Sequence, residues 1–191
     1  MFENLKRRIR TISSTPPPGM KAGAGVQVKR PFRISAPSHI TVGEQTEIGA
    51  HALITPITAY ASERFSPSIE IGSGVYIGPH LYLAAIGRVV IGDRCVLSEH
   101  VYINDCSHGL DPEGGPIMEQ KLVRGGDIEI GEGCFLGFRS AILPGVRLGA
   151  HCIVGINSVV TKSFPELSMV AGCPAKLIKR WCAEEKKWKL V

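Results

Sequence analysis

Aliphatic residues recur at every sixth position along much of this chain, and that spacing restricts the possible folds more than any other feature. The clearest run has six members, Ile130, Leu136, Ile142, Leu148, Val154 and Val160. An α-helix needs apolar neighbours three and four residues apart, so side chains six apart cannot form one helical stripe. The period instead indicates short flat strands with a turn every six residues.

The same period occurs upstream, and each triplet of aliphatic residues predicts one coil of a solenoid. The triplets are Val28, Ile34 and Ile40; Val42, Ile48 and Ile54; Ile71, Ile77 and Leu83; and Ile91, Leu97 and Ile103. Four residues after each aliphatic position stands a mostly small side chain that we also expect to point inward: Thr46, Ala52, Val75, Cys95, Val101, Ser107, Cys134, Ser140, Val146, Cys152 and Ser158. Glycine often follows the aliphatic residue, at a place where a Cβ would clash. The sequence therefore predicts an all-β protein, a parallel β-helix of about six coils shaped as a triangular prism.

Three segments are expected along the chain. Residues 1–24 predict a basic helix with an apolar stripe (Phe2, Leu5, Ile9 and Ile12) followed by a Pro-rich linker, and the stripe suits either capping of the prism or contact with an anionic membrane surface. Residues 25–173 form the prism, with excursions at 60–70 and 109–129 expected as external loops. Residues 174–191 predict a C-terminal helix that packs on the prism.

Composition limits the classes of function. The 191 residues, 44% of them hydrophobic, suffice for one domain with its own core. The net charge of +5 divides into +7 over residues 1–34, −6 over residues 35–161 and +4 over residues 162–191, so the cations sit at the two ends rather than along one nucleic-acid-binding face. The sequence has no apolar run of about 18 residues and no secretory signal, so we expect a cytoplasmic protein. Its six cysteines include no CxxC pair, and we expect them to be reduced thiols.

The pattern [LIV]-G-x-x-small-x resembles the hexapeptide-repeat acyltransferase family over about residues 25–180. The stretch from IGEGCFLGFRSAILPG to AGCPAKLIKRW is similar to the sugar O-acetyltransferase branch, which includes maltose and galactoside acetyltransferases. The resemblance implies a left-handed β-helix, acetyl-CoA as the acyl donor, no metal, and a homotrimer with its sites between subunits. It also implies a sugar or surface glycan as the acceptor.

His108 is the candidate general base. It ends the segment INDCSHG, where the prism meets the second excursion, and an imidazole that is neutral near pH 7 can accept the proton of an acceptor hydroxyl. The family places its catalytic histidine at the same junction. Asn104 and Asp105 could hold the acceptor or orient the imidazole, or they could be ordinary turn residues. The other histidines, His39, His51, His80, His100 and His151, are interpreted as turn or surface residues.

Further positions carry over from the family residue by residue. Phe135 stands where the sugar acetyltransferases usually have tryptophan and could form a wall of the acceptor site. The backbone N–H of Phe138 matches the oxyanion donor, although both Phe138 and Ile156 are bulkier than is common there. Ile156 and Thr161 match contacts to the pantetheine arm of coenzyme A. Lys162, Lys176 and Lys179 lie where the phosphates are bound, and the local excess of cations agrees with that placement.

Several alternatives stay open. An N-acetyltransferase acting on an amino sugar or a xenobiotic acetyltransferase would share the base and the donor. A non-enzymatic trimeric scaffold would need neither. A γ-class carbonic anhydrase is argued against, because Phe138 and Leu143 stand where that enzyme needs zinc-binding histidines.

Overall fold

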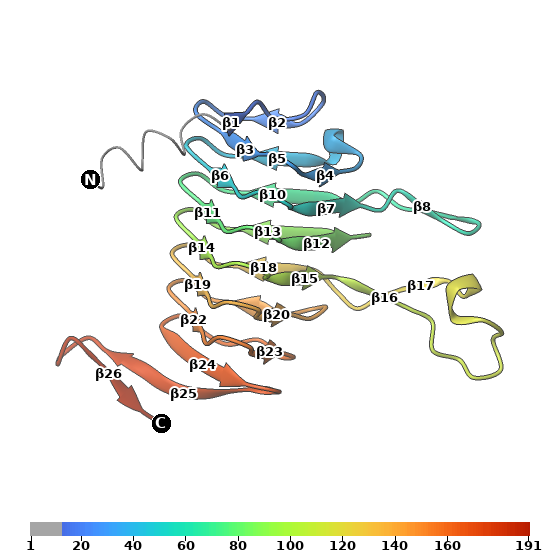
Figure 1. The fold of residues 1–191 in the computed structure, drawn as a ribbon. Helices are drawn as coiled ribbons and strands as arrows, with labels where there is room; N and C mark the ends of the chain where they lie inside the picture. The colour runs from blue at the N-terminus through green and yellow to red at the C-terminus, as the bar shows by residue number, and fades with distance from the viewer. Residues whose placement is uncertain (1–12) are drawn as a thin grey trace.

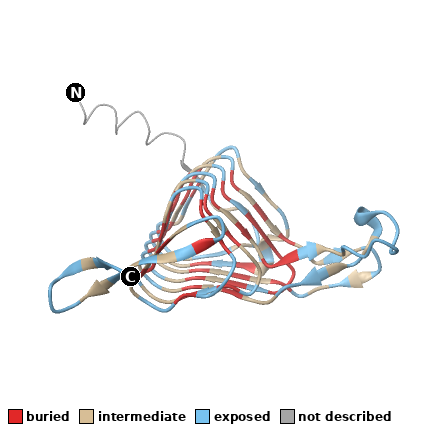
Figure 2. Cartoon of the chain, turned by 90° about the horizontal axis from the view of Figure 1, so that it is seen from below, coloured by how far each residue is buried: buried red, intermediate tan, exposed pale blue. Residues whose placement is uncertain are grey.

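The computed structural model describes residues 13–191, and Figure 1 shows that nearly all of its regular structure is β-strand. The strands stack into three sheets that form the walls of a triangular prism, seen along its axis in Figure 2. We number the walls in the order in which each coil visits them. Every pairing between strands of successive coils is parallel, so the prediction of a parallel β-helix is confirmed.

Wall 1 contains β3 (Gln27–Lys29), β6 (Glu47–Ile48), β11 (Tyr76–Ile77), β14 (Val96–Leu97), β19 (Phe135–Leu136), β22 (Ile153–Val154) and β24 (Ser168–Gly172). Wall 2 contains β4 (Arg33–Ile34), β7 (Leu53–Pro56), β12 (Tyr82–Ala85), β15 (Tyr102–Asn104), β20 (Ala141–Ile142) and β23 (Val159–Val160). Wall 3 contains β2 (Lys21–Ala22), β5 (Ile40–Val42), β10 (Ser68–Ile71), β13 (Arg88–Ile91), β18 (Ile128–Ile130) and β21 (Arg147–Leu148). Walls 2 and 3 each have six strands, in agreement with about six coils.

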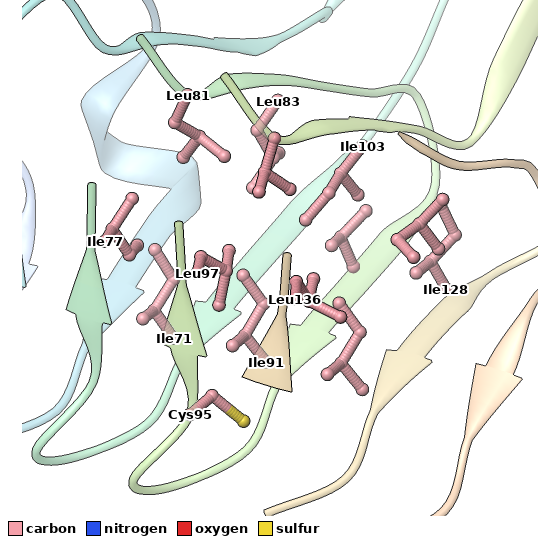
Figure 3. Packing of buried hydrophobic residues seen from close by; sticks show 14 of the residues in the cluster. Ile71, Ile77, Leu81, Leu83, Ile91, Cys95, Leu97, Ile103, Ile128 and Leu136 are labelled. Carbon is pink, nitrogen blue, oxygen red and sulfur yellow. The ribbon is translucent and has the colours of Figure 1, made fainter. Parts of the chain in front are cut away.

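The aliphatic residues of the six-residue repeat fill the interior of the prism (Figure 3). All of them are buried except Ile34, which is partly buried against the same cluster. Burial of each such side chain contributes about 1.5–3 kcal/mol before the entropy of ordering is counted. The small residues four positions later are buried as well, with one exception, Ser107. The prediction for Ser107 was wrong because the chain has already left the prism there.

Glycine follows the inward aliphatic residue because successive coils approach each other closely at that point. A Cβ on Gly131 would lie 2.6 Å from the backbone nitrogen of Ala150, and one on Gly92 would lie 2.6 Å from that of Glu132. Neither glycine has a positive φ. The requirement is therefore one of space between coils rather than of backbone conformation.

Two antiparallel hairpins leave the prism directly after strands of wall 2 and project on the same side of the molecule (Figure 1). The first contains β8 (Ala59–Tyr60) and β9 (Glu63–Arg64), and the second contains β16 (Cys106–His108) and β17 (Leu122–Arg124). They correspond to the two predicted excursions. Two short 3₁₀ turns, η2 (Pro37–His39) and η3 (Ile117–Glu119), complete the connections, and η3 lies within the second hairpin.

The C-terminal helix was predicted wrongly. Residues after the prism form β25 (Ala175–Cys182) and β26 (Lys187–Leu190), which extend wall 1 antiparallel to β24. Exposure alternates along β25, with Ala175 buried, Lys176 exposed and Leu177 half-buried, as a strand requires. The open edge of β24 offers unpaired backbone groups, and pairing with β25 covers them where a helix would not.

At the other end of the prism, β1 (Ser13–Ser14) pairs antiparallel with β3. The predicted helix with Phe2, Leu5, Ile9 and Ile12 lies outside the described residues. Strand β2 already pairs with β5 inside the segment assigned to the linker, so the first coil begins a few residues before position 25. The division into 1–24, 25–173 and 174–191 otherwise stays a prediction.

The outer faces of the walls differ in chemistry. Wall 2 presents a column of Leu53, Tyr82, Tyr102, Ala141 and Val159, and wall 1 presents Tyr76, Val96, Phe135, Ile153 and Met169. Wall 3 presents Thr41, Glu70, Val90, Glu129 and Arg147 in the same position. Walls 1 and 2 are therefore apolar on the outside along these columns, apart from Gln27, Glu47 and Arg33 in the first coils, whereas wall 3 is charged.

Candidate active site

His108 ends strand β16 at the base of the second hairpin and is half-buried. The strand pairs antiparallel with β17, which places His108 opposite Leu122. The N–H of the next residue, Gly109, donates to the carbonyl of Lys121 at 2.9 Å. The backbone on both sides of the histidine is thus fixed by ladder hydrogen bonds, although the residue lies outside the prism.

Tyr60, on β8 of the other hairpin, contacts the imidazole. Its hydroxyl oxygen lies 3.3 Å from His108 Nδ1, and the two rings meet edge to face with centroids 5.3 Å apart. The same hydroxyl donates to the carbonyl of Met118 in η3. Sequence reasoning missed Tyr60, since nothing in the repeat pattern marks a residue 48 positions before the histidine.

A second contact joins the hairpins. Lys121 precedes β17, and its backbone carbonyl accepts the N–H of Gly109. Its side-chain Nζ lies 3.7 Å from Glu63 Oε1. The lysine is 73% exposed, so this ion pair alone contributes little to stability. Together with the Tyr60 contacts it gives the two hairpins a defined relative position.

Asn104 and Asp105 lie next to the histidine in sequence, but their polar atoms are directed elsewhere. The Asp105 carboxylate is fully buried and accepts the backbone N–H groups of Ile86 at 2.9 Å and Gly87 at 2.7 Å. The Asn104 side chain donates to the Tyr102 hydroxyl at 3.0 Å and accepts from the backbone of Cys106 at 3.3 Å. Neither side chain contacts the imidazole. Asn104, which is half-buried, is the one with surface towards solvent.

Cys106 stands two residues before the histidine and could be mistaken for a nucleophile. Burial, followed by the nearby Asp105 carboxylate, raises the pKa of its thiol to about 11. Because the thiolate is the reactive form, such a thiol is a poor nucleophile near pH 7. An acyl-cysteine intermediate is therefore disfavoured at this position.

The residues expected to bind coenzyme A lie at the other corner of wall 2. Phe138 and Ile156 occupy equivalent turn positions in successive coils, between wall 1 and wall 2, where Asn157 N–H donates to the Phe138 carbonyl at 2.8 Å. Within residues 13–191 no group accepts the N–H of Phe138 or of Ile156. Phe135 is on the adjoining outer face of wall 1, 40% exposed. This corner thus offers two free N–H donors and an aromatic surface.

The cationic residues follow towards the C-terminal end of the prism. Thr161 and Lys162 are exposed directly after β23, and the Lys162 ammonium lies 5.8 Å from the ring centre of Phe164. Lys176 is exposed on β25 and Lys179 is half-buried on the same strand, opposite Met169. Because this segment is a strand and not the predicted helix, the two lysines are spaced along an extended backbone and do not share one helical face.

Three of the remaining histidines, His51, His80 and His100, form a column on the corner that carries Phe138. The rings of His51 and His80 stack with centroids 4.6 Å apart, those of His80 and His100 with centroids 4.4 Å apart, and His100 meets Phe138 edge to face at 5.6 Å. Burial, and then the neighbouring imidazoles, lower the pKa of His80. These parallel rings do not converge on a common point. In the described part of the chain no group of three or more His, Cys, Asp or Glu side chains is arranged to hold a metal ion.

The chain is similar to known proteins in both sequence and fold. The family described as "Hexapeptide repeat of succinyl-transferase" matches residues 127–162, which form the last regular coils. A putative lipopolysaccharide biosynthesis O-acetyl transferase of Escherichia coli, WbbJ, is 33% identical over 126 residues, which are 63% of this chain and 64% of that protein. The resemblance to hexapeptide-repeat acyltransferases is therefore confirmed. The left-handed sense of the prism stays what that resemblance implies.

Two further proteins that are named as acyltransferases are similar to this chain. The galactoside O-acetyltransferase of Escherichia coli is 25% identical over 154 residues, which are 78% of this chain and 73% of that protein. The crystal structure of a point mutant of AntD, an N-acyltransferase from Bacillus cereus, in complex with dTDP and coenzyme A superposes with a TM-score of 0.71 at 19% identity, covering 94% of this chain and 89% of that chain. At that identity AntD shows the fold alone. The chain spans less than two thirds of the length of WbbJ.

Within one chain the structure does not bring the two halves of the expected site together. His108 lies past the end of a wall 2 strand, whereas Phe138 and Ile156 precede the strands of the same wall. The whole width of wall 2 separates them.

No helix among the described residues is long and apolar enough to cross a membrane.

Proposed function

We propose that this protein is an acetyl-CoA-dependent O-acetyltransferase that acetylates a hydroxyl of a sugar or surface glycan, with His108 as the general base. The observation that carries the proposal is the placement of a half-buried imidazole at one corner of wall 2 and of two free backbone N–H groups at the other. A base and an oxyanion donor are the two groups that acyl transfer to a hydroxyl requires.

The reaction is direct transfer within a ternary complex. His108 takes the proton of the acceptor hydroxyl as its oxygen attacks the thioester carbonyl, and the Phe138 N–H stabilises the tetrahedral oxyanion. The carbon–sulfur bond then breaks, and the protonated His108 returns the proton to the leaving thiolate. The products are the acetyl ester and coenzyme A. The raised pKa of Cys106 supports this route over one through an acyl-enzyme.

We further propose a homotrimer, because the two halves of the site lie a wall apart in one chain. A neighbouring copy that packs against the apolar column of wall 2 can bring its Phe138 corner to the hairpins that carry His108. The outer residues of wall 2 (Leu53, Tyr82, Tyr102) suit such burial, whereas those of wall 3 (Glu70, Glu129, Arg147) suit solvent.

The donor site continues from that corner. Ile156 N–H and Thr161 are proposed to contact the pantetheine arm, and Lys162, Lys176 and Lys179 the phosphates. Phe135 and Asn104 are proposed to border the acceptor. The assignment of Asp105 to the acceptor is less well supported, because both of its carboxylate oxygens already bind backbone N–H groups. A cytoplasmic location and contact of residues 1–12 with a membrane stay predictions.

The proposal is tested by incubating the protein with acetyl-CoA and a panel of glycans, following free thiol and acceptor mass. His108→Ala should lower kcat by about 10²–10⁴ and leave acetyl-CoA binding nearly unchanged. His151→Ala is the matched control, since His151 is exposed at the corner between wall 3 and wall 1, where its Nε2 lies 3.9 Å from Glu132 Oε1. Near-normal turnover of His108→Ala would overturn the assignment of the base. If light scattering shows a monomer at the assay concentration and that monomer is fully active, the proposal of a trimer is overturned.

An N-acyltransferase acting on an amino sugar is the second candidate, because an imidazole base and free N–H donors serve transfer to an amine as well as to a hydroxyl. The same panel separates the two, because an acetyl ester is cleaved by hydroxylamine and an acetamide is not. A scaffold without activity would release no thiol with any acceptor while still forming the trimer.

A further inference from the structure

The hydroxyl of Tyr60 has two partners, and one of them can only accept a hydrogen bond. That partner is the carbonyl oxygen of Met118. A phenol carries a single proton, so Tyr60 must donate that proton to Met118. Its oxygen is then left with lone pairs only.

The second partner is Nδ1 of His108, 3.3 Å away. Since the Tyr60 oxygen has no second proton, this contact is a hydrogen bond only if Nδ1 carries the proton and donates it. A neutral imidazole holds one proton on its two nitrogens. The other nitrogen, Nε2, is therefore unprotonated.

We propose that Tyr60 is a positioning residue for His108, which holds the imidazole as the Nδ1–H tautomer and so leaves Nε2 free to take the acceptor's proton. The inference rests on the proposed function of His108. It adds a residue from a different hairpin and names the nitrogen that acts as the base. A tyrosine oxygen here does what a carbonyl or carboxylate does for many histidine bases, which is to fix tautomer and ring orientation.

The hydrogen bond persists through the proposed reaction. When Nε2 takes the proton of the acceptor hydroxyl, Nδ1 keeps its own proton and continues to donate to Tyr60. The edge-to-face contact of the rings holds the imidazole plane at an interplanar angle of 65° to the phenol. Tyr60 thus orients the base without exchanging a proton with it.

A purely structural role for Tyr60 would be to tether the two hairpins. The ion pair of Lys121 with Glu63 also joins them, but it does not touch the imidazole. Lys121→Gln therefore weakens the tether and leaves the hydrogen bond in place. Tyr60→Phe removes the hydroxyl and keeps the ring, so the edge contact and the local packing survive.

The experiment compares wild type, Tyr60→Phe and Lys121→Gln in the intact protein labelled with ¹⁵N-histidine. Long-range ¹H–¹⁵N spectra distinguish protonated from unprotonated ring nitrogens, and His108→Gln identifies the His108 signals. We expect wild type and Lys121→Gln to show His108 with protonated Nδ1 and unprotonated Nε2. Tyr60→Phe should show a mixture of both tautomers. With the acceptor that the glycan panel identifies, the kcat of Tyr60→Phe should fall about tenfold, with the KM for acetyl-CoA unchanged.

The outcomes separate this inference from the proposed function. A wild-type spectrum with protonated Nε2, or a Tyr60→Phe spectrum identical to wild type, overturns the role of Tyr60 even if His108→Ala is inactive. Equal losses in Tyr60→Phe and Lys121→Gln with unchanged spectra would mean that Tyr60 only tethers the hairpins. If the tautomer shifts as expected but His108→Ala keeps its turnover, the hydrogen bond stands and the proposed base is wrong.

Discussion

The carboxylate of Asp105 accepts the backbone N–H of Gly87 at 2.7 Å, across one coil of the prism. Its second oxygen accepts the N–H of Ile86, and the side chain is fully buried. The chain makes a turn at these residues between wall 2 and wall 3, where no β-ladder can satisfy the two N–H groups. Asp105 therefore closes a corner of the prism immediately below the hairpin that carries His108.

Substitution of Asp105 by asparagine tests this role. The amide would place an NH₂ group against one of the two backbone donors, leaving it without an acceptor, and such a loss in a buried site costs about 1–3 kcal/mol. We expect the free energy of unfolding to fall by that amount in urea titrations. Asp111→Asn, on the exposed part of the second hairpin, should leave it unchanged. An Asp105→Asn protein as stable as wild type would contradict the anchoring role.

The interior of the prism could be predicted from the sequence because one short-range period determines it. Every coil repeats the same geometry, so the positions of Ile130 and Val160 follow from counting, and close packing of the coils explains Gly131. The C-terminal strand β25 could not be predicted in the same way. Ala175–Cys182 has apolar residues compatible with either period, and only the free edge of β24 decides for a strand.

The surroundings of His108 were partly predictable for a similar reason. The histidine itself ends a recognisable repeat, whereas Tyr60 and Asp105 act across the chain on groups that no periodicity marks. Tyr60 meets His108 because two hairpins of unrelated sequence dock through a carbonyl and an ion pair. The buried state of Asp105 depends on a turn 18 residues earlier. Such contacts are set by the folded geometry and leave no local signal.

The donor site leads to a prediction about charge. If Lys176 and Lys179 bind the phosphates of acetyl-CoA, the double substitution to glutamine should raise KM for acetyl-CoA about tenfold, equivalent to about 1.4 kcal/mol, and flatten its dependence on salt. The acceptor KM should hardly change. Lys21→Gln, at the opposite end of the prism, serves as the control. A double variant with weakened acceptor binding and normal acetyl-CoA kinetics would place an anionic glycan at these lysines instead.

The six cysteines should differ in reactivity. Cys95, Cys106, Cys134 and Cys152 are buried, and the thiols of Cys95, Cys134 and Cys152 donate to backbone carbonyls. Cys173 is exposed. A hydrogen bond from the backbone of Glu185 lowers the pKa of the Cys182 thiol. We expect iodoacetamide to label Cys173 and Cys182 in the native protein and the other four only after unfolding, as followed by peptide mass spectrometry. Rapid native labelling of Cys134 would mean that the prism opens.

The charged outer face of wall 3 should make stability depend on pH. The Arg88 guanidinium forms two hydrogen bonds of 3.0 Å to the Glu70 carboxylate and, as the largest effect, lowers the pKa of Glu70 below its ordinary value of 4.5. A carboxyl whose pKa is lower in the folded state adds stability above its unfolded pKa, and this stability disappears as the pH falls through the folded value.

Glu70→Gln should therefore be less stable than wild type near neutral pH and should lose less stability on acidification below about pH 4.5. The pair is exposed, so we expect a difference of no more than about 1 kcal/mol. Urea unfolding at neutral and acidic pH, with the exposed Glu113→Gln as control, measures it, and parallel pH curves for wild type and Glu70→Gln would contradict the linkage.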